Sequence, residues 1–355
     1  MTMKQKILVV DDAPANLRIL VESLSDEYSI AAARDGHKAI ALANAKHRPD
    51  LILLDVMMPG LDGFEVCLKL KADPATWDIP VLFITALNDE ENEVRGLTVG
   101  GVDFISKPFN PALVKARVRS HLELKSHRDR LEELVVNRTR ELLRTQDVTI
   151  NALASLAETR DPETGGHIKR TQHYVRLLAE QLIDHPDFME LQEPGMINLL
   201  YKSSPLHDVG KVGVPDHILL KPDTLTREEF EEMKRHADYG WKALDGAMRE
   251  LGDNSFLRVA AEISYTHHEK WDGSGYPRGL AGREIPVSGR LMALADVYDA
   301  LICRRVYKPP FTHEQATEII LQGRGQHFDP NVVDAFLRLQ HPFQELAQQY
   351  ADSAE

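Results

Sequence analysis

Two pairs of adjacent residues in the second half of the chain could bind metal ions, His207-Asp208 and His267-His268. Imidazole nitrogens and carboxylate oxygens together form a ligand set that suits iron, manganese, zinc or nickel. Lys211 adds a positive charge three residues after Asp208, where it could contact a phosphate group. Further candidate ligands stand apart along the sequence at His167, His236 and Asp296. These residue types together indicate a metal cluster suited to phosphate chemistry.

The spacing of the two pairs bears on how many ions they hold. Neighbouring residues on a helix project about 100° apart, so each pair more easily serves two metals than one. A carboxylate that bridges two ions, as Asp208 would, holds them about 4 Å apart and favours hydrolysis by an activated water. Asp296 lies in an apolar segment, where an unpaired charge costs several kcal/mol. We therefore expect a partner for it.

A second set of polar residues marks the first third of the chain. Asp11 and Asp12 directly follow an apolar run, and Asp55, Thr85 and Lys107 end three later ones. In a parallel α/β sheet, ligands bind at the carboxyl ends of the strands. Carboxylates that converge there repel one another unless a cation is present, which predicts a Mg²⁺ site. The cluster is also suited to accept a phosphoryl group on a carboxylate.

The apolar runs predict the elements that position this second set. Short runs buried on both faces predict strands at 7–10, 51–54 and 81–84, with weaker strands near 30–33 and 102–105. Amphipathic helical segments, for example 15–24 and 63–71, fill the gaps. Strands that alternate with helices imply βαβ units, so residues 1–122 are predicted to form an α/β domain with a doubly wound, five-stranded parallel sheet.

Residues 123–150 are predicted to form a linker helix, because neither Gly nor Pro occurs between Pro111 and Pro162. A loose heptad repeat of apolar residues comprises Leu124, Leu131, Val135, Leu142 and Leu156. A strong coiled coil would place Leu or Ile at the seam positions that are held by Arg128, Arg138 and Thr145. Two interpretations stay open: a solvated spacer helix, or a helix that pairs in a homodimer and carries signal.

Residues 151–355 show helical patterns broken by Gly- and Pro-rich loops, which predicts an all-α domain. A chain of 355 residues is too long for a single core, so the whole is multidomain. No apolar run approaches the roughly 20 residues that span a bilayer. The net charge of −13 argues against DNA binding. Two isolated cysteines, Cys67 and Cys303, fit a reducing compartment, so we expect a cytoplasmic protein.

The acidic set resembles the receiver domain of two-component response regulators over residues 4–121. The resemblance implies that Asp55 is the phosphoacceptor for a sensor histidine kinase. It also implies that Asp11, Asp12 and the Met57 carbonyl hold Mg²⁺, and that Thr85 and Lys107 bind the phosphoryl group. Phe104 would be an aromatic switch, and Lys107-Pro108 a cis peptide bond.

Residues 150–342 resemble the HD-GYP phosphodiesterases, a subgroup of the HD phosphohydrolases. The match rests on the stretch His207-Asp208-Val209-Gly210-Lys211 and on Gly275-Tyr276-Pro277 after the second histidine pair. It implies that Asp208 and Lys211 act in catalysis and that the metal ligands are His167, His207, Asp208, His236, His267, His268 and Asp296. A segment similar to the family's Arg-Pro-Tyr-Lys implies that Arg305 and Lys308, with Lys211, contact the substrate.

Two residues depart from the family's pattern, and the role of one loop stays open. Val306 replaces the usual proline of the substrate segment, and Glu163 stands where many relatives have tyrosine. Glu163 lies four residues before His167, so both could face one centre and create a third metal position; the alternative is that Glu163 caps a helix. The Gly273–Pro277 stretch equally fits a loop that shapes the pocket mouth and a direct substrate contact.

The resemblance implies a metal-dependent hydrolase of 3′,5′-cyclic dinucleotides with two or three divalent transition metals, iron or manganese above others. Cyclic di-GMP is the expected substrate, with linear dinucleotide and then GMP as products, and phosphorylation of Asp55 would control the reaction. One alternative is a non-catalytic output module that binds a cyclic dinucleotide or a protein, which the intact Lys211 and metal set weaken. Another is a phosphodiesterase for a different cyclic dinucleotide such as cyclic GMP-AMP.

Overall fold

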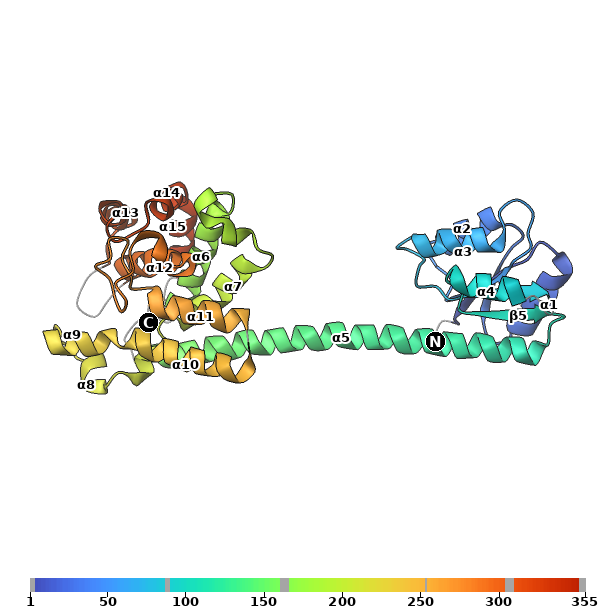
Figure 1. Cartoon of the computed structure of the whole chain (residues 1–355), viewed down its shortest axis with the longest axis horizontal. Helices are drawn as coiled ribbons and strands as arrows, with labels where there is room; N and C mark the ends of the chain where they lie inside the picture. The colour runs from blue at the N-terminus through green and yellow to red at the C-terminus, as the bar shows by residue number, and fades with distance from the viewer. Residues whose placement is uncertain (1–3, 87–89, 160–165, 253, 304–309, 351–355) are drawn as a thin grey trace. The chain divides into compact units, whose positions relative to one another are not determined.

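The computed structural model describes residues 4–86, 90–159, 166–252, 254–303 and 310–350. They form two compact units, one within residues 1–140 and one within 141–355. The first unit is an α/β domain and the second is helical (Figure 1). Among the described helices, none is both long and apolar enough to cross a membrane.

The first unit is built on a five-stranded sheet with strand order β2-β1-β3-β4-β5, in which every pairing is parallel. All five predicted strands are confirmed, each boundary lying within two residues of the expectation. The strands are β1 (Lys6–Val10), β2 (Ser29–Ala33), β3 (Leu51–Asp55), β4 (Val81–Ala86) and β5 (Asp103–Lys107).

Helices cover both faces of the sheet, as a doubly wound fold requires. Because side chains alternate along a strand, Ile7 and Val9 of β1 pack with one set of helices while Leu8 and Val10 pack with the other. The first set comprises α1 (Pro14–Leu24) and the start of α5 (Pro111–Thr159), and the second comprises α2 (Gly36–Ala43) and α3 (Gly63–Ala72) (Figure 1). The remaining helix of this unit is α4 (Glu90–Thr98).

Local sequence fixes where α3 begins beside the end of β3. Asp62 and Glu65 form a reciprocal capping box at its first turn. A side chain at Gly63 would place its Cβ 2.3 Å from the carbonyl oxygen of Asp55. Glycine therefore allows the helix start to lie directly against the strand end that carries the Asp55 carboxylate.

Helix α5 is a single helix that includes the whole predicted linker at 123–150. Its first turns contribute Val114, Val118 and Leu122 to the core of the α/β unit. One turn further on, the ammonium of Lys125 lies 2.8 Å from the Asp78 carboxylate, which ties the helix to the same unit.

The second unit is helical, which confirms the all-α prediction. Its α-helices are α6 (His167–Leu182), α7 (Met196–Ser203), α8 (Asp216–Leu219), α9 (Arg227–Lys234), α10 (His236–Leu251), α11 (Ser255–Thr266), α12 (Val287–Ile302), α13 (His313–Gln322), α14 (Pro330–Arg338) and α15 (Gln340–Gln349). Short 3-10 helices are η1 (Pro186–Gln192), η2 (Ser204–Leu206), η3 (Val209–Gly213) and η4 (Gly282–Glu284).

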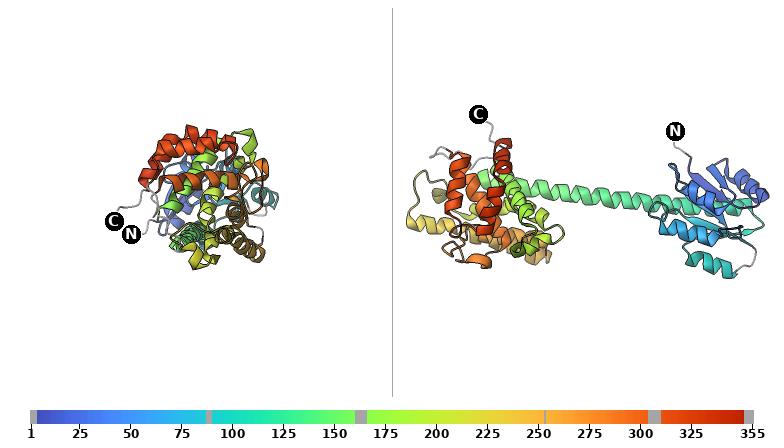
Figure 2. Two further views of the ribbon diagram at one scale, coloured as in Figure 1. Left: turned by 90° about the vertical axis from the view of Figure 1, so that its left-hand side faces the viewer. Right: turned by 90° about the horizontal axis from the view of Figure 1, so that it is seen from above.

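The core of this unit gathers around α6 and α12. Tyr174 and Leu178 of α6 pack with Leu291, Leu294 and Tyr298 of α12. Helices α13, α14 and α15 lie beside this pair (Figures 1 and 2). Since α12 is covered from several sides, its sequence is apolar around most of the helix, and a charged residue on it must find a partner inside the unit.

Candidate functional site

The candidate metal ligands of the second unit come from five separate places along the chain. His167 begins α6, His207 and Asp208 lie between η2 and η3, and His236 begins α10. His267 and His268 follow α11, and Asp296 lies within α12. Most of these side chains stand at the ends of helices, where the backbone turns and can direct them to one point.

The structure brings these residues into two neighbouring groups. The first comprises His167, His207 and Asp296, and the second comprises Asp208, His236, His267 and His268; within each group the ligand atoms lie within 4.8 Å of one another. In the first group, Nε2 of His167 is 3.3 Å from Nε2 of His207 and 3.7 Å from Oδ1 of Asp296. The carboxylate thus faces the lone pairs of two imidazoles, and a cation bound among these groups would be the partner that its apolar surroundings demand.

Asp208 lies between the two groups. Its Oδ2 is 3.2 Å from Nε2 of His207, in the first group. Its Oδ1 is 3.3 Å from Nε2 of His236 and 3.5 Å from Nε2 of His267, in the second. One carboxylate oxygen thus faces each group, which is the arrangement of a bridging ligand between two ions.

Hydrogen bonds fix which imidazole nitrogens carry lone pairs. Nδ1 of His207 lies 3.0 Å from the Ser204 carbonyl, and Nδ1 of His236 lies 2.7 Å from that of Met233. A carbonyl only accepts, so each Nδ1 must carry the proton and each neutral ring presents a lone pair on Nε2. His267 follows the same rule through the carbonyls of Ile263 and Ser264, each 3.1 Å from its Nδ1.

In the resulting cluster, the hydrogen-bond acceptor nitrogens of the imidazoles face the acceptor oxygens of a carboxylate. Lone pairs on three imidazoles converge on Asp208, and its buried Oδ1 receives no hydrogen bond from the described residues. Lys211 is the cation in contact with this carboxylate, with its ammonium 2.7 Å from Oδ2. A donor set of this kind fits divalent cations, which would occupy the points where the lone pairs meet.

The pKa values of residues in the cluster also favour metal binding. Burial lowers the pKa of His236 to about 4, and burial together with the charge of His267 lowers the pKa of His268 well below its ordinary value. Burial also opposes ionisation of Asp208, but Lys211 and His207 outweigh it and hold the pKa of that carboxyl well below its usual range. The neutral imidazoles of His236 and His268 beside an ionised carboxylate are the protonation states that metal binding requires. His207 differs, because the neighbouring Asp208 charge outweighs the effect of burial and raises the pKa of its imidazole.

The second histidine pair departs from the geometry expected for helical neighbours. His267 caps the C-terminus of α11 and His268 lies in the turn that follows, so the pair does not lie within a helix. The two ring centroids are 4.0 Å apart, and both residues fall in the same group. The expectation that this pair serves two different metals is therefore wrong, because the helix ends before it.

Residues around the cluster hold its members in place. Oδ2 of Asp299 lies 2.8 Å from Nδ1 of His167, and the same carboxylate accepts two hydrogen bonds from the buried guanidinium of Arg170. The ring of Tyr276 stacks on His268 with centroids 4.7 Å apart. Asp299 was missed from the sequence, although its position three residues after Asp296 on a buried helix was a usable signal.

The Gly-Tyr-Pro loop is anchored by a buried carboxylate. Glu269 accepts hydrogen bonds from the backbone amides of Arg278 and Leu280, at 2.7 and 3.0 Å. Gly273 adopts a positive φ of 81°, and the Tyr276-Pro277 bond is cis. The loop thereby carries Tyr276 back onto a candidate ligand, which supports a role in shaping the site. Three residues expected to act there, Glu163, Arg305 and Lys308, lie outside the described residues.

A separate acidic pocket forms at the carboxyl edge of the sheet in the first unit. Asp11, Asp12 and Asp55 place carboxylate oxygens within 4.8 Å of one another. The Lys107 ammonium lies 3.0 Å from Asp11 and 2.9 Å from Asp55. The hydroxyl of Thr85 is buried and has no hydrogen-bond partner among the described residues. The donor set fits a hard cation such as Mg²⁺ beside a position for an anionic group.

Burial raises the pKa of Asp55, and the charge of Asp11 adds to the rise while a hydrogen bond from Lys107 opposes it. A nearby cation would remove this penalty and keep the carboxylate nucleophilic. The Lys107-Pro108 bond is cis, as the resemblance to receiver domains implied. Met57 is exposed beside the pocket end of β3, and Phe104 is half-buried with the Arg117 guanidinium 5.3 Å above its ring.

Comparison with known proteins assigns both units. Residues 7–119 match the response regulator receiver domain, and residues 151–332 match the HD domain. A probable cyclic di-GMP phosphodiesterase of Vibrio cholerae serotype O1 is 50% identical over 98% of this chain and 80% of its own length. The cyclic di-GMP phosphodiesterase response regulator RpfG of Xanthomonas campestris pv. campestris is 36% identical over 98% of this chain and 91% of its own.

A third relative is similar to little more than half of this chain. The 3′3′-cGAMP-specific phosphodiesterase 2 of Vibrio cholerae serotype O1 is 43% identical over 57% of this chain and 36% of its own length. Proteins named for two different cyclic dinucleotides are thus similar to this chain.

Proposed function

Since the chain belongs to the HD domain family of metal-dependent phosphodiesterases and carries a response regulator receiver domain, we propose that its substrate is cyclic di-GMP. The proposal rests on the two groups of candidate metal ligands with Asp208 between them. The Lys211 ammonium contacts the carboxylate of Asp208. Relatives that span most of the chain are named for this substrate, which favours it over other phosphodiesters.

The chain's own residues divide the work of phosphodiester hydrolysis. His167, His207 and Asp296 would hold one divalent ion, His236, His267 and His268 the other, and Asp208 both. Such ions activate water at neutral pH and neutralise charge on a phosphate group. Lys211, whose ammonium already lies at this carboxylate, is placed to stabilise negative charge on the phosphate and its leaving oxygen. Arg305 and Lys308 would hold the phosphates and bases of the dinucleotide.

The same ligand set supports a proposal for the type and number of metal ions. Neutral imidazoles with few carboxylates favour iron or manganese over Mg²⁺ in the second unit. Two ions match the two groups, and Glu163 would add a third position. Two ions per chain, unchanged in Glu163→Ala, would remove that third position from the proposal.

The acidic pocket of the first unit is proposed as the control input. Mg²⁺ held by Asp11, Asp12 and the Met57 carbonyl would let Asp55 accept a phosphoryl group from a sensor histidine kinase. The buried hydroxyl of Thr85 and the ammonium of Lys107 would then bind its oxygens. Phe104 would change its packing with the state of the pocket, and phosphorylation would alter turnover in the second unit.

Cyclic GMP-AMP is the second candidate substrate, because a relative that is 43% identical over 57% of this chain is named for it. The decisive experiment incubates the Mn²⁺- or Fe²⁺-loaded full chain with cyclic di-GMP, cyclic GMP-AMP and cyclic di-AMP and separates the products by chromatography. We expect linear dinucleotide and then GMP from cyclic di-GMP, at the highest rate of the three. Cleavage of none of them by metal-loaded protein would favour the non-catalytic binding module.

Variants separate the two proposed sites. Asp208→Ala should abolish turnover, whereas Asp55→Ala should leave the basal rate and remove its response to a small phosphodonor such as acetyl phosphate. Equal loss of basal turnover in both variants would contradict this division. A cytoplasmic location, suggested by Cys67 and Cys303, and the lack of DNA binding, suggested by the charge of −13, belong to the same proposal.

A further inference from the structure

Arg170 lies three residues after His167 on α6, and each nitrogen of its guanidinium has a partner inside the fold. Its Nε and Nη2 donate to the two carboxylate oxygens of Asp299, at 2.7 and 3.0 Å. Nη2 also lies 2.9 Å from the sulfur of Cys303. The side chain is only 1% exposed, so this permanent charge serves other residues of the chain rather than a substrate.

The Asp299 carboxylate connects Arg170 to the metal centre. Its Oδ2 lies 2.8 Å from Nδ1 of His167. Because a carboxylate only accepts hydrogen bonds, the imidazole proton is on Nδ1 and the lone pair is on Nε2, which faces His207 and Asp296. Since Arg170 holds both oxygens of Asp299, the orientation of the His167 ring depends on where the guanidinium stands.

The remaining nitrogen of Arg170 is held by the end of α15. Nη1 donates to the backbone carbonyl of Tyr350 at 2.7 Å. Tyr350 is the C-cap of α15, and carbonyls at the end of a helix have no partner within that helix. A cation there also meets the negative pole of the helix dipole. The end of α15 thus supplies Arg170 with an acceptor that suits its charge.

Ring contacts fix the end of α15 against α6. The Tyr350 ring stacks on His173 of α6 with centroids 5.3 Å apart, and its hydroxyl lies 3.2 Å from Nε2 of that ring. Earlier on α15, Phe343 stacks on Tyr174 at 4.4 Å within the main core. The Tyr350 carbonyl is therefore held in one place by side chains on both sides of it in the fold.

A glycine makes room for the contact between Arg170 and the end of α15. A Cβ on Gly166 would stand 2.2 Å from Nη1 of Arg170 and 2.5 Å from the Tyr350 oxygen. Any larger residue at this position would push the two groups apart. Because Gly166 directly precedes His167, the contact forms beside the first candidate ligand.

We propose that Tyr350 is a positioning residue of the metal centre and acts through its backbone carbonyl. The carbonyl holds the guanidinium of Arg170, and Arg170 in turn holds the Asp299 carboxylate on the imidazole of His167. The end of α15 thereby sets how tightly the group of His167, His207 and Asp296 binds a metal ion. This inference rests on the proposed metal centre, and one of its tests needs no metal.

Two shortened chains isolate the carbonyl from the rest of the C-terminus. A chain that ends at Tyr350 keeps an oxygen acceptor for Arg170, whereas a chain that ends at Gln349 loses it. In the second chain, Mn²⁺ titration of the metal-free protein should show one of the two ions bound about 10- to 100-fold more weakly. The first chain should bind both ions as the full chain does. Equal affinities in the two shortened chains overturn the proposal, and no Mn²⁺ binding by the full chain overturns the metal centre with it.

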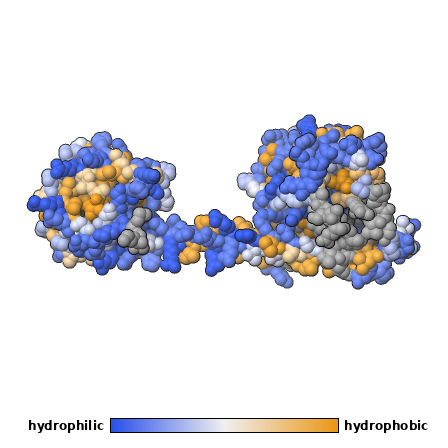
Figure 3. Space-filling model, turned by 180° about the vertical axis from the view of Figure 1, so that it is seen from behind, coloured by the Kyte–Doolittle hydropathy of each residue, from blue (hydrophilic) through white to orange (hydrophobic). Residues whose placement is uncertain are grey.

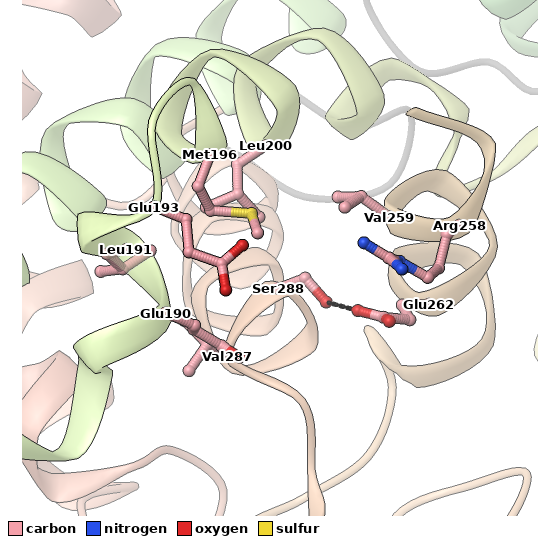
Figure 4. A pocket seen from close by; sticks show the side chains of 10 residues that line it. All are labelled: Glu190, Leu191, Glu193, Met196, Leu200, Arg258, Val259, Glu262, Val287 and Ser288. Atoms are coloured by element: carbon pink, nitrogen blue, oxygen red, sulfur yellow. Dashed lines mark hydrogen bonds between the residues drawn. The ribbon is translucent and has the colours of Figure 1, made fainter. Parts of the chain in front are cut away.

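Two substitutions separate positioning from a loss of stability. Gly166→Ala keeps the whole C-terminus but crowds the contact, so it should weaken the same Mn²⁺ ion. Ser288→Ala is the control on α12: this buried hydroxyl donates to Glu262 in a separate cavity of about 320 Å³ (Figure 4). Neither Arg170 nor Asp299 lines that cavity. Its loss should lower the thermal unfolding midpoint and leave both Mn²⁺ affinities unchanged. An equal loss of Mn²⁺ affinity in Ser288→Ala and Gly166→Ala overturns the proposal.

NMR of the metal-free protein tests the hydrogen bond on His167 directly. With isotope-labelled histidine, a buried imidazole N–H that donates to a carboxylate gives its own resonance, which His167→Gln assigns by its absence. We expect this resonance in the full chain and in the chain that ends at Tyr350. It should shift or vanish in Gly166→Ala and in the chain that ends at Gln349. The same resonance in all of these chains, or its absence from the full chain, overturns the proposal whatever the metal binding shows.

Discussion

The imidazoles of the metal centre depend on groups that are not themselves ligands. Backbone carbonyls hold the Nδ1 atoms of His207, His236 and His267, and the Asp299 carboxylate holds that of His167. His268 differs, because a ring rather than a hydrogen bond covers it: Tyr276 stacks on it at 4.7 Å with an interplanar angle of 30°. The tyrosine therefore acts as a positioning residue through its ring.

This geometry makes a prediction that separates the ring of Tyr276 from its hydroxyl. Tyr276→Phe keeps the stacked ring and should bind Mn²⁺ like the unchanged protein. Tyr276→Ala removes the ring and leaves His268 free to turn, so metal affinity should fall about 10- to 100-fold, the usual loss when a group that orients a ligand is removed. Metal titration of the apo full chain measures both. Equal loss in the two variants would assign the effect to the hydroxyl instead.

The buried thiol of Cys67 gives a residue-scale prediction for pH. Cys67 is fully buried in α3, and burial raises the pKa of its thiol to about 11. The thiolate is the reactive form, and at pH 8 only about one thiol in a thousand is ionised at such a pKa. Iodoacetamide should leave Cys67 unmodified in the native chain at pH 8, with a rate that rises as pH approaches 11.

Peptide mass spectrometry reads out the labelling of Cys67. The same reaction in 6 M guanidinium chloride, where the thiol regains an ordinary pKa, supplies the rate of the accessible residue. Native labelling at pH 8 that matches the denatured rate would show that the α3 face of the sheet opens readily.

At the scale of elements, close packing of η3 on α10 places the central carboxylate. Gly210 lies in η3, between Asp208 and Lys211, and a Cβ there would stand 1.9 Å from the His236 carbonyl oxygen and 2.4 Å from the Gly240 amide nitrogen. Only a residue without a side chain permits this approach. Asp208 before η3 and His236 at the start of α10 are thereby held within 3.3 Å of each other.

Gly210→Ala should therefore separate the two elements. We expect a loss of about 2 kcal/mol or more in the free energy of unfolding, as for other overpacked sites, together with a large fall in metal affinity. Gly246→Ala is the matched control, because Gly246 lies on the same helix α10 with no atom within 4 Å of its added Cβ. That variant should be more stable by roughly 0.5–1 kcal/mol. Similar losses in both would contradict the packing argument.

The same elements show what the sequence could and could not predict. The five strands were predictable because each is an apolar run buried on both faces, and the long helix because neither Gly nor Pro interrupts it. The short 3-10 helices that flank His207-Asp208 were not, since Pro205 and Gly210 mark a break without specifying which way the chain turns. The end of α11 before His267 was missed for a related reason: the apolar pattern continues to the histidine pair, and no Gly or Pro marks the boundary.

Candidate residues followed a similar rule. The candidate ligands could be picked out because their chemistry is unusual at their positions, as with Asp296 among alanines and leucines. Residues whose role depends on contacts with residues distant in the sequence could not be predicted. Glu269 and Asp299 are charged residues beside known candidates, but only the fold shows that one holds the Gly-Tyr-Pro loop and the other holds His167.

At the scale of the whole molecule, the middle of α5 exposes apolar residues that have no partner within the described chain. Leu131, Val135 and Leu142 are 62%, 64% and 71% exposed, and they belong to one heptad seam. Figure 3 shows apolar side chains among hydrophilic ones on this helix. A second copy of the chain would cover the seam, which supports the homodimer as a proposal, while Arg128 and Arg138 in the same seam would weaken the pairing.

The two interpretations of the linker predict different masses in solution. If α5 pairs, the full chain should be dimeric by size-exclusion chromatography with light scattering, and Leu131→Glu with Val135→Glu should return it to a monomer of 40.0 kDa. Charges placed at facing seam positions repel and lose the apolar contact that drives association. Val136→Glu is the control, because Val136 is 55% exposed yet lies one position outside the seam. It should stay dimeric. If the unchanged chain is a monomer at every concentration, or if the two variants have identical masses, α5 is a solvated spacer. Asp55 would then control turnover within a single chain.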